Sequence, residues 1–326
     1  MTDIVRTIIS SYNDLMENRS DQRVKDWFMM SSPFPTLLIC LCYAYFVKRL
    51  GPRLMANRKP FVLRRTILVY NLIQVCFSIY IFNESIVYGW GGKYSFRCQP
   101  IDYSDSPDAL RMARICWLYY ISKFIEFADT IFFVLRKKNN QITTLHVIHH
   151  GVVPFSVWFG VKFTPGGQST FFGMLNVFVH IWMYGYYFLA ALGPSVQRYL
   201  WWKKYLTTLQ IVQFVLVVIH SGQLLFIDCD YPKAFVWWIG MHACLFFFLF
   251  RSFYMEAYVK KSAKRKDAEL ELTKHKEAVD KLQQNRLEKG KSSIYADDYR
   301  VATGYISDEG LRNRVYIDKN RSSDDS

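Results

Sequence analysis

Long apolar stretches constrain the fold of this chain more than any other feature. A transmembrane helix needs about 20 mostly apolar residues, and stretches of this kind recur along the chain with short polar connections between them. The composition agrees, because 51% of the 326 residues are hydrophobic and 17% are aromatic, which is rich for one soluble domain. The sequence therefore predicts an all-α multi-pass membrane protein with seven transmembrane helices, over residues 27–47, 66–88, 115–135, 145–161, 170–192, 206–227 and 234–255.

Charge in the connections predicts the orientation of these helices. Seven basic residues and no acidic residue lie between positions 48 and 65, directly after the first stretch. The connections expected on the opposite side contain the acidic residues Asp102, Asp105, Asp108, Asp228 and Asp230. Because positive charge in short loops remains in the cytosol, we expect a luminal N-terminus and a cytosolic C-terminus.

The same pattern divides the chain into three parts. Residues 1–26 form a luminal N-terminal segment, residues 27–258 form the membrane domain, and residues 259–326 form a charged, largely disordered cytosolic tail. The start of the tail is dense in Lys and Glu with few leucines, which fits either a solvated helix or disorder. The net charge of +14 indicates lipid headgroups, since basic residues flank the apolar stretches and no nucleic-acid motif accompanies them. The lipid bilayer is therefore an expected partner, and nucleic acid is not.

Two of the seven cysteines differ from the others in their placement. Cys98 and Cys229 fall in the two connections assigned to the lumen, whereas the other five lie within apolar stretches. Disulfides persist in an oxidising compartment, so we predict a Cys98–Cys229 disulfide. Two free thiols are the alternative.

Three histidines within one apolar stretch are the strongest chemical signal. His146, His149 and His150 lie at i, i+3 and i+4, which places their imidazoles on one helical face. Polar side chains at membrane depth are costly and usually face the interior of a bundle. The cluster is therefore predicted to be a functional site, either for metal ligation or for handling an acyl group.

Further polar residues follow helical spacing in neighbouring stretches. Lys123, Glu126, Asp129 and Thr130 share one face, and their alternative interpretation is an ion pair that holds helices together. Two more apolar stretches carry a similar polar face, for which hydrogen bonds between packed helices are the alternative. Their polar residues are Asn176, His180, Tyr184 and Tyr187 in one stretch, and Thr207, Gln210 and Gln213 in the next.

Together these segments resemble the four signature motifs of the ELO family of very-long-chain fatty acid elongases. The motifs are KFIEFADT at 123–130, HVIHH at 146–150, NVFVHIWMYGYY at 176–187 and TTLQIVQF at 207–214, in the family's order and spacing. The resemblance covers residues 27–258. It implies a seven-helix fold in which six helices surround a narrow acyl tunnel that opens to the cytosol.

The resemblance also implies an activity and a location. Members of this family are 3-oxoacyl-CoA synthases of the endoplasmic reticulum membrane, which join a long-chain acyl-CoA to malonyl-CoA with loss of carbon dioxide. The expected partners are these two substrates and the other enzymes of the elongation cycle, and no cofactor or metal is expected. The sequence leaves open the acyl chain length and the oligomeric state, a homodimer included.

This reaction needs a group that accepts the acyl chain, donors that stabilise an enolate, and a dry slot for the alkyl chain. We assign His149 as the nucleophile, with His180 sharing the acyl or enolate oxygen. His146 and His150 orient these groups. Direct attack by the malonyl-derived carbanion is the alternative to an acyl-histidine intermediate. The remaining catalytic candidates are Lys123, Glu126 and Asp129, and the substrate-binding candidates are Asn176, Tyr184, Tyr187, Thr130, Gln210, Gln213, Lys137, Lys138, Lys204 and Arg251.

Two other classes of protein share part of this pattern. Membrane desaturases carry HxxHH motifs, but they resemble a set of several histidine boxes that supply about eight ligands to two irons. Here only His180, His220 and His242 lie in other apolar stretches, which is too few. Receptors and transporters also have seven spans, yet they do not require Lys, Glu, Asp and His to converge at one depth.

Overall fold

Helices occupy all seven predicted ranges in the computed structural model, which describes residues 2–288. They are α2 (Pro33–Tyr45), α4 (Arg64–Ser85), α5 (Pro107–Ile125) followed by α6 (Phe127–Leu135), α7 (Thr144–Phe163), α8 (Thr170–Ala191), α10 (Lys203–Gly222) and α11 (Lys233–Tyr254). No strand occurs among the described residues, so the all-α prediction is confirmed for them.

Shorter helical pieces extend or connect these helices. They are η1 (Gln22–Val24), η2 (Phe46–Leu50), α3 (Gly51–Met55), η3 (Ile86–Trp90), η4 (Asn139–Gln141), η5 (Gly167–Ser169), α9 (Pro194–Gln197) and η6 (Gln223–Leu225). The N-terminal segment contains α1 (Thr2–Glu17), a helix that is not among the seven predicted from the sequence.

The chain divides into two compact units, Met1–Tyr254 and a second that begins at Met255. The second unit contains η7 (Met255–Lys260) and α12 (Lys261–Glu288). A solvated helix, one of the two alternatives for the start of the tail, therefore describes α12. The rest of the predicted disordered tail lies outside the described residues.

Five helices of residues 2–288 are long and apolar enough to cross a membrane. They contain α2, α4, α8, α10 and α11, and the protein is accordingly a multi-pass membrane protein. The other two predicted spans are α5 with α6, and α7. These are the helices that carry the Lys–Glu stripe and the histidine motif, and such charged and polar residues lower their mean hydropathy.

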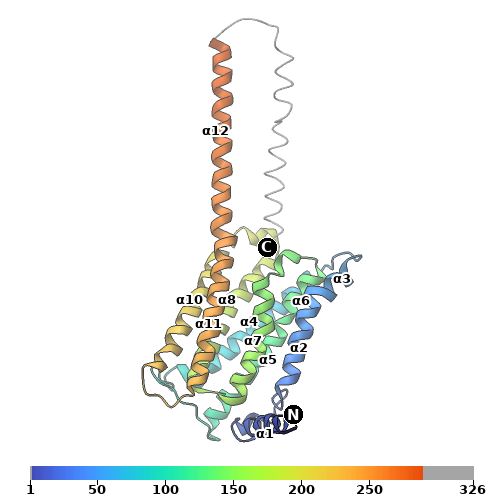
Figure 1. The fold of residues 1–326 in the computed structure, drawn as a ribbon. Helices are drawn as coiled ribbons and strands as arrows, with labels where there is room; N and C mark the ends of the chain where they lie inside the picture. Colours follow the sequence, from blue (N-terminus) through green and yellow to red (C-terminus); the bar gives the residue numbers. More distant parts are fainter. Residues whose placement is uncertain (1, 289–326) are drawn as a thin grey trace. The chain divides into compact units, whose positions relative to one another are not determined.

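Six helices contact one another in a closed cycle. Its order is α4, α5, α7, α11, α10 and α8, which returns to α4, and α2 packs against α7 outside it. Figure 1 shows these helices running side by side along one direction. Large aromatic and aliphatic side chains line the interior of the cycle, as in the cluster of Ile81, Met112, Ile115, Tyr119 and Val177. Apolar side chains thus lie both inside the bundle and on its outer surface.

The third predicted helix departs from the sequence expectation. Residues 115–135 are not one helix, because α5 ends at Ile125 and α6 begins at Phe127. The N–H of Glu126 is shared between the carbonyl oxygens of Ser122 and Phe124, a tight geometry common at helix ends. The break falls in the middle of the polar stripe and directs Glu126 into the interior, where it is 1% exposed.

The basic connections meet at one end of the bundle, here called the basic end. Arg64 Nε donates to the carbonyl of Ala191 at 2.9 Å, which joins the start of α4 to the end of α8. Lys137 Nζ donates to the carbonyl of Ala56 at 3.0 Å, which joins the connections after α6 and α3. The grouping of loops that the charges predict is therefore present in the fold.

The acidic connections meet at the opposite end, here called the acidic end. The Cys98–Cys229 disulfide, predicted from the sequence, joins the α4–α5 and α10–α11 connections. Gln168 binds the first of these through main-chain and side-chain bonds to Gln99, 2.8 and 2.9 Å long. The neighbouring Gly167 has φ +63°, and a Cβ there would lie 2.9 Å from the Gln99 carbonyl oxygen. Only glycine permits this close approach.

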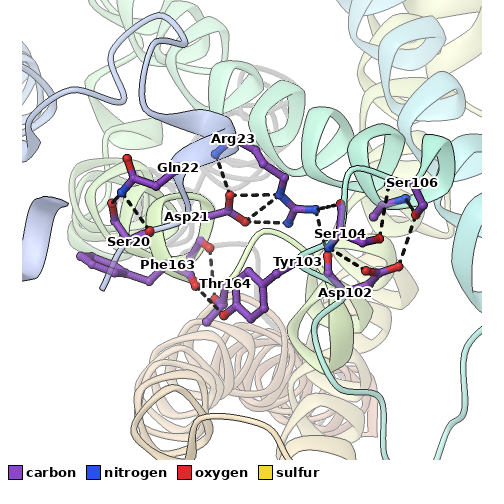
Figure 2. A network of polar contacts seen from close by, with 12 residues as sticks. Ser20, Asp21, Gln22, Arg23, Asp102, Tyr103, Ser104, Ser106, Phe163 and Thr164 are labelled. Carbon is purple, nitrogen blue, oxygen red and sulfur yellow. Dashed lines mark hydrogen bonds and ion pairs between the residues drawn. The ribbon is translucent and has the colours of Figure 1, made fainter. Parts of the chain in front are cut away.

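A partly buried arginine fastens the N-terminal segment to the acidic end (Figure 2). The guanidinium of Arg23 contacts both carboxylate oxygens of Asp21, at 2.6 Å for Nη2 and Oδ2. Its Nη1 donates to the carbonyl oxygens of Asp102 and Ser104, at 3.0 and 2.6 Å. The Asp21 N–H donates to the carbonyl of Lys162 at the end of α7. We call Asp21, Arg23, Asp102 and Ser104 the clasp.

The carboxylate of Asp102 preorganises the loop that the clasp holds. Hydrogen bonds from Ser104, from its side chain first and then its backbone N–H, lower the pKa of Asp102, with Ser106 and Arg23 contributing in the same direction. A lowered pKa in the folded state stabilises the fold above the unfolded value of about 3.9, and this contribution is lost as the pH falls through the folded value. The loop is therefore stable in its folded geometry at neutral pH.

The clasp gives a prediction about stability. Arg23→Ala leaves the Asp21 carboxylate, whose side chain is 2% exposed, without its cation. Breaking a buried pair in this way costs about 3–5 kcal/mol, so we expect a fall in Tm of about 5 °C or more, measured by thermal unfolding in detergent. Arg19→Ala is the matched control, because Arg19 pairs with Asp14 in solvent and its side chain is 74% exposed. Equal Tm values for the two variants would contradict the clasp.

Candidate active site

Glu126 is the centre of a buried polar cluster formed by three helical segments. Its Oε1 lies 2.6 Å from Lys123 Nζ and 3.3 Å from His180 Nδ1, and its Oε2 lies 4.0 Å from His150 Nδ1. Lys123 comes from α5, His150 from α7 and His180 from α8. The predicted convergence of charged residues and imidazoles from separate helices is therefore present.

Local sequence explains how the histidines reach this point. Thr143 caps α7, because its hydroxyl accepts a hydrogen bond from the His146 N–H at 3.2 Å. The cap starts the helix immediately before the HVIHH motif, so the three imidazoles leave its first turns at the basic end. The break at Glu126 aims the carboxylate at the same level.

Asn176 and Tyr119 complete the environment of Lys123. Lys123 Nζ donates to Asn176 Oδ1 at 3.0 Å and lies 4.4 Å from the centre of the Tyr119 ring. The Tyr119 hydroxyl donates to the same Asn176 oxygen at 2.9 Å. Two donors on Oδ1 fix the orientation of the amide and direct Asn176 Nδ2 elsewhere, as a donor. Lys123 thus has one anion, one amide oxygen and one aromatic face around it.

His146 is held by a chain of hydroxyl groups. Its Nε2 lies 2.7 Å from Thr130 Oγ1, and Thr130 lies 2.8 Å from the hydroxyl of Tyr43 on α2. The His146 ring is 4.4 Å from the ring of His150. One nitrogen of His146 is therefore engaged in a positioning contact.

His149 differs from the other imidazoles of the cluster. Its Nδ1 is buried and has no hydrogen-bond partner in the described part of the chain. Phe246 and Phe250 of α11 flank its ring, with centroid distances of 4.8 and 6.2 Å, and the ring of His150 lies 5.3 Å away. Buried polar atoms are nearly always paired, so the unpaired Nδ1 distinguishes His149 from His146 and His180, whose ring nitrogens have partners.

Asp129 lies one turn beyond Glu126 and has its own partners. The Tyr184 hydroxyl donates to Asp129 Oδ2 at 2.7 Å, and the Tyr70 ring packs edge-on against Tyr184 with centroids 6.0 Å apart. Gln74 Nε2 donates to the Tyr70 hydroxyl at 3.2 Å. Asp129 therefore belongs to a second polar network, which lies next to the Glu126 cluster.

Other predicted substrate-binding residues lie farther out. Tyr187 is 38% exposed and stacks edge-on against Tyr184. Gln210 Nε2 donates to Met183 Sδ at 3.7 Å, a contact between α10 and α8 that fits the helix-packing alternative. Gln213 is buried, and its Oε1 has no hydrogen-bond partner within residues 2–288.

The predicted cationic residues lie in or next to the connections at the basic end. Lys204 lies over the Tyr205 ring at 4.9 Å, and Lys137 binds the Ala56 carbonyl. Arg251 is exposed, and Lys138 lies in the same connection as Lys137. Their positions at the basic end fit both loop topology and contact with a charged substrate.

Tyrosines are the residues that sequence reasoning missed. Tyr119, Tyr43 and Tyr70 each bind a predicted site residue through the hydroxyl group or the ring. All three are buried and lie in apolar stretches that contain many aromatic residues. Helical spacing gave one signal, because Tyr119 precedes Lys123 by four residues and so shares its face.

An apolar cavity of about 90 Å³ lies on the other side of Tyr119. It is bounded by α4, α5, α7, α8 and α11, and it extends from Tyr119 towards the acidic end. Its walls include Ile115, Val157, Gly160, Gly173 and Trp238. Tyr119 contacts the Glu126 cluster and also lines the cavity, so the polar side chains and the apolar cavity lie next to each other.

Metal binding finds little support in the donor geometry. Among residues 2–288, no three His, Cys, Asp and Glu side chains form a group that could hold a metal ion. The Lys123 ammonium, 2.6 Å from Glu126, already occupies the cation position beside the carboxylate. The imidazoles therefore surround an ion pair.

Comparison with known proteins identifies the family. The model of the ELO: GNS1/SUR4 family matches residues 28–266. The chain belongs to the ELO family. It is 62% identical to a very long chain fatty acid elongase of Aedes aegypti over 266 residues, which cover 81% of this chain and 74% of the relative. It is 60% identical to very long chain fatty acid elongase 7 of Drosophila melanogaster (81% and 80% covered) and 47% identical to human elongase 1 (78% and 92% covered).

The extent of the ELO family match agrees with the fold. Residues 28–266 begin before α2 and include every helix that contributes to the Glu126 cluster and to the cavity. The segment that contains α1 precedes the match. The resemblance stated from the four motifs is confirmed.

A double substitution distinguishes a structural role of the Lys123–Glu126 ion pair from a role in catalysis. Glu126→Gln leaves the Lys123 ammonium buried and unpaired, which costs about 3–5 kcal/mol, while removal of both charges by Lys123→Met with Glu126→Gln is close to neutral. We expect the double variant to recover thermal stability but not the fatty acid elongation for which the relatives are named.

The matched control is the Arg111–Glu84 ion pair, which lies apart from the imidazoles and is more exposed. Arg111→Met with Glu84→Gln should retain elongation. Normal elongation by the stable Lys123/Glu126 double variant would show that the buried pair is purely architectural.

Proposed function

We propose that this ELO protein is a very-long-chain 3-oxoacyl-CoA synthase, which condenses a long-chain acyl-CoA with malonyl-CoA to give a 3-oxoacyl-CoA, carbon dioxide and CoA. The observation that carries the proposal is the meeting of imidazoles from α7 and α8 at Glu126, next to an apolar cavity. Imidazoles supply nucleophilic and proton-transfer chemistry. The cavity supplies a dry place for an alkyl chain.

His149 is the proposed nucleophile. Its buried Nδ1 is unpaired, whereas His146 is bound to Thr130 and His180 faces Glu126. A ring nitrogen of His149 attacks the thioester carbon, the C–S bond breaks, and the departing CoA thiolate takes the imidazole proton. The product of this half-reaction is an acyl-histidine and free CoA.

The second half-reaction uses the donors around Glu126. Malonyl-CoA loses carbon dioxide, and the resulting enolate carbon attacks the acyl carbon, which breaks the bond to His149. The released imidazole nitrogen takes up one proton that comes from the solvent, so the two half-reactions together consume one proton. The enolate oxygen needs a donor while its negative charge exists. Asn176 Nδ2 and His180 are the proposed donors. The carboxylate of Glu126 orients His180 through Nδ1, as the carboxylate of a catalytic triad orients its histidine.

Direct condensation is the second candidate for the mechanism. In that route the enolate attacks the acyl-CoA thioester itself, and His149 acts only as a hydrogen-bonding or basic group. Both routes use the same residues and the same overall reaction, and neither requires a metal or a cofactor. They differ in whether CoA leaves before malonyl-CoA is present.

The placement of substrates follows from the two ends of the bundle. The imidazoles lie towards the basic end, so we propose that acyl-CoA approaches from there and that its chain extends past Tyr119 into a tunnel within the six-helix cycle. Lys137, Lys138, Lys204 and Arg251 are the proposed cations for CoA phosphates. In this arrangement all seven predicted helices span the membrane.

Location and partners follow from the same proposal. Positive charge keeps the basic end in the cytosol, where CoA thioesters occur, and leaves the N-terminus and the Cys98–Cys229 disulfide in the lumen. We propose residence in the endoplasmic reticulum membrane together with the reductases and dehydratase of the elongation cycle. A homodimer is compatible with this arrangement.

A first experiment tests the nucleophile. His149→Ala should lose elongation by several orders of magnitude, as expected when a nucleophile is removed, and wild-type enzyme quenched with acyl-CoA alone should gain the mass of one acyl group with release of CoA. His242→Gln is the matched control, because His242 lies on α11 with its Nδ1 against the Trp238 carbonyl. A fully active His149→Ala variant would remove this residue from catalysis. Absence of acylated enzyme would favour direct condensation.

A second experiment tests the tunnel. Gly160 lines the cavity, and a Cβ built there meets no atom within 4 Å, so Gly160→Leu should fill the cavity without disturbing α7. With a panel of acyl-CoA substrates and labelled malonyl-CoA, we expect products to shift towards shorter chains. Gly240→Leu on α11 is the control, since that glycine also has open space but does not line the cavity. An unchanged product range in Gly160→Leu would place the acyl chain elsewhere.

A further inference from the structure

Helix α1 has an apolar face that the rest of the protein leaves uncovered. At 100° per residue its seven apolar side chains fall within about 140° of the circumference, and the polar side chains Asp3 to Glu17 occupy the remainder. Five of the apolar side chains are largely solvent-accessible, with exposed fractions from 67% for Ile4 to 40% for Leu15. The apolar residues are Ile4, Val5, Ile8, Ile9, Tyr12, Leu15 and Met16.

The position of α1 in the fold says what this face meets. Figure 1 shows α1 lying across the end of the bundle at which α2 begins, with its axis transverse to α2. Met16 packs into the cluster of Met30, Tyr120 and Trp158, which fixes the C-terminal part of α1 to the bundle. In a bundle that spans a bilayer, a helix at this position and angle would lie parallel to the membrane surface.

The apolar face of α1 is continuous with the lipid-facing surface of α2. The Tyr12 ring is 6.1 Å from the ring of Phe34 in the first turn of α2. Phe34, Leu38 and Leu41 are 63%, 62% and 59% exposed, and they belong to a helix that is long and apolar enough to cross a membrane. The bilayer that covers these α2 residues therefore extends to α1.

We propose that α1 is an interfacial anchor whose apolar face inserts into the leaflet at the acidic end of the bundle, between the headgroups and the acyl chains. This inference rests on the membrane insertion of the bundle and is independent of its catalytic activity. An amphipathic helix with low mean hydropathy and a transverse orientation is typical of this mode of binding.

The charge on the polar face of α1 indicates which kind of lipid the anchor binds. The polar face of α1 carries the acids Asp3, Asp14 and Glu17 and the single base Arg6, so these side chains sum to −2. Helices that bind anionic lipid by electrostatics present Lys and Arg on that face. The anchor therefore binds the membrane through the hydrophobic effect alone, and a bilayer of neutral phosphatidylcholine is sufficient for this binding.

The anchor also has a structural consequence. The chain passes from Glu17 through Ser20 into the clasp at Asp21 and Arg23, and Ser20 Oγ donates to the Met16 carbonyl at 2.6 Å. A helix inserted in the leaflet would hold the short connection between α1 and the clasp at a fixed depth in the membrane. The clasp and the anchor then fasten the acidic end from two sides.

Spin labels on the full-length protein test the proposal. A spin-labelled keto amino acid replaces Ile8 in one sample and Ser10 in a matched control, both in phosphatidylcholine vesicles. The two positions lie on opposite faces of α1, and the native cysteines remain unchanged. Collision rates with oxygen, which concentrates in hydrocarbon, and with a water-soluble nickel chelate report the surroundings of each label.

We expect the label at Ile8 to favour oxygen, at a depth of about 5–10 Å below the headgroups, and the label at Ser10 to favour nickel. Nickel-favoured collisions at both positions would place α1 in water and overturn the proposal. Spin–spin broadening at Ile8 that disappears on dilution with unlabelled protein would instead identify a second copy of the chain as the partner, and would also overturn it.

Lipid composition tests the argument from charge. Addition of phosphatidylserine to the vesicles should leave the collision rates at Ile8 unchanged. Insertion that occurs only with phosphatidylserine would contradict an apolar anchor. Ile8→Asp, read with the label at Ile4, should shift that label towards nickel, whereas Ser10→Asp should not; equal shifts would show that the apolar face is not what holds α1.

Discussion

The ion pair of Lys123 and Glu126 is the interaction on which the centre of this structure depends. Both side chains are 2% exposed, and neither charge could remain buried alone, since an isolated ion in an apolar interior loses far more solvation energy than any local contact restores. Asn176, Tyr119 and His180 supply the additional partners that a buried pair requires. These partners come from α5 and α8, so the pair also fixes how these two helices meet.

The break between α5 and α6 follows from the same constraint. In one uninterrupted helix, regular helical geometry would fix the directions of the Lys123 and Glu126 side chains. The position of the carboxylate would then depend on that geometry alone. The tight turn at Glu126 places the carboxylate between Lys123, His150 and His180. Local departure from helical geometry is typical of functional positions in membrane helices, where neighbouring groups satisfy the freed backbone.

The two ends of the bundle are fastened differently, and this difference has a physical reason. The acidic end is joined by a disulfide, by the Arg23–Asp21 pair and by the bonds between Gln99 and Gln168. The basic end is joined by side-chain bonds to carbonyl groups at the edges of the helices, such as that of Arg64 with Ala191. Under the proposed function a large polar substrate enters at the basic end, which leaves the acidic end as the one that permanent links can close.

Much of this arrangement could be predicted from the sequence, because it rests on periodicity and charge. Apolar length gave the helices, spacing of three and four gave the shared face of the HVIHH imidazoles, and the compartment argument gave Cys98–Cys229. Helix breaks, side-chain partners and the role of α1 did not follow. Tyr43 and Tyr70 look like ordinary aromatic residues of apolar stretches until the fold places the Tyr43 hydroxyl beside Thr130 and the Tyr70 ring against Tyr184. Such partners lie far apart in sequence, so no local pattern encodes them.

Tyr119 shows how one residue can couple the two halves of the site. Its hydroxyl binds Asn176, its ring faces the Lys123 ammonium, and the residue also forms part of the cavity wall. A chain that fills the cavity would therefore touch the side chain that holds the amide and the cation in place. Because aromatic contacts with a cation are strongest when water is excluded, occupancy of the slot would strengthen the arrangement around Glu126. If the cavity holds the proposed acyl chain, the length of that chain and the geometry of the polar cluster are physically linked through the Tyr119 ring.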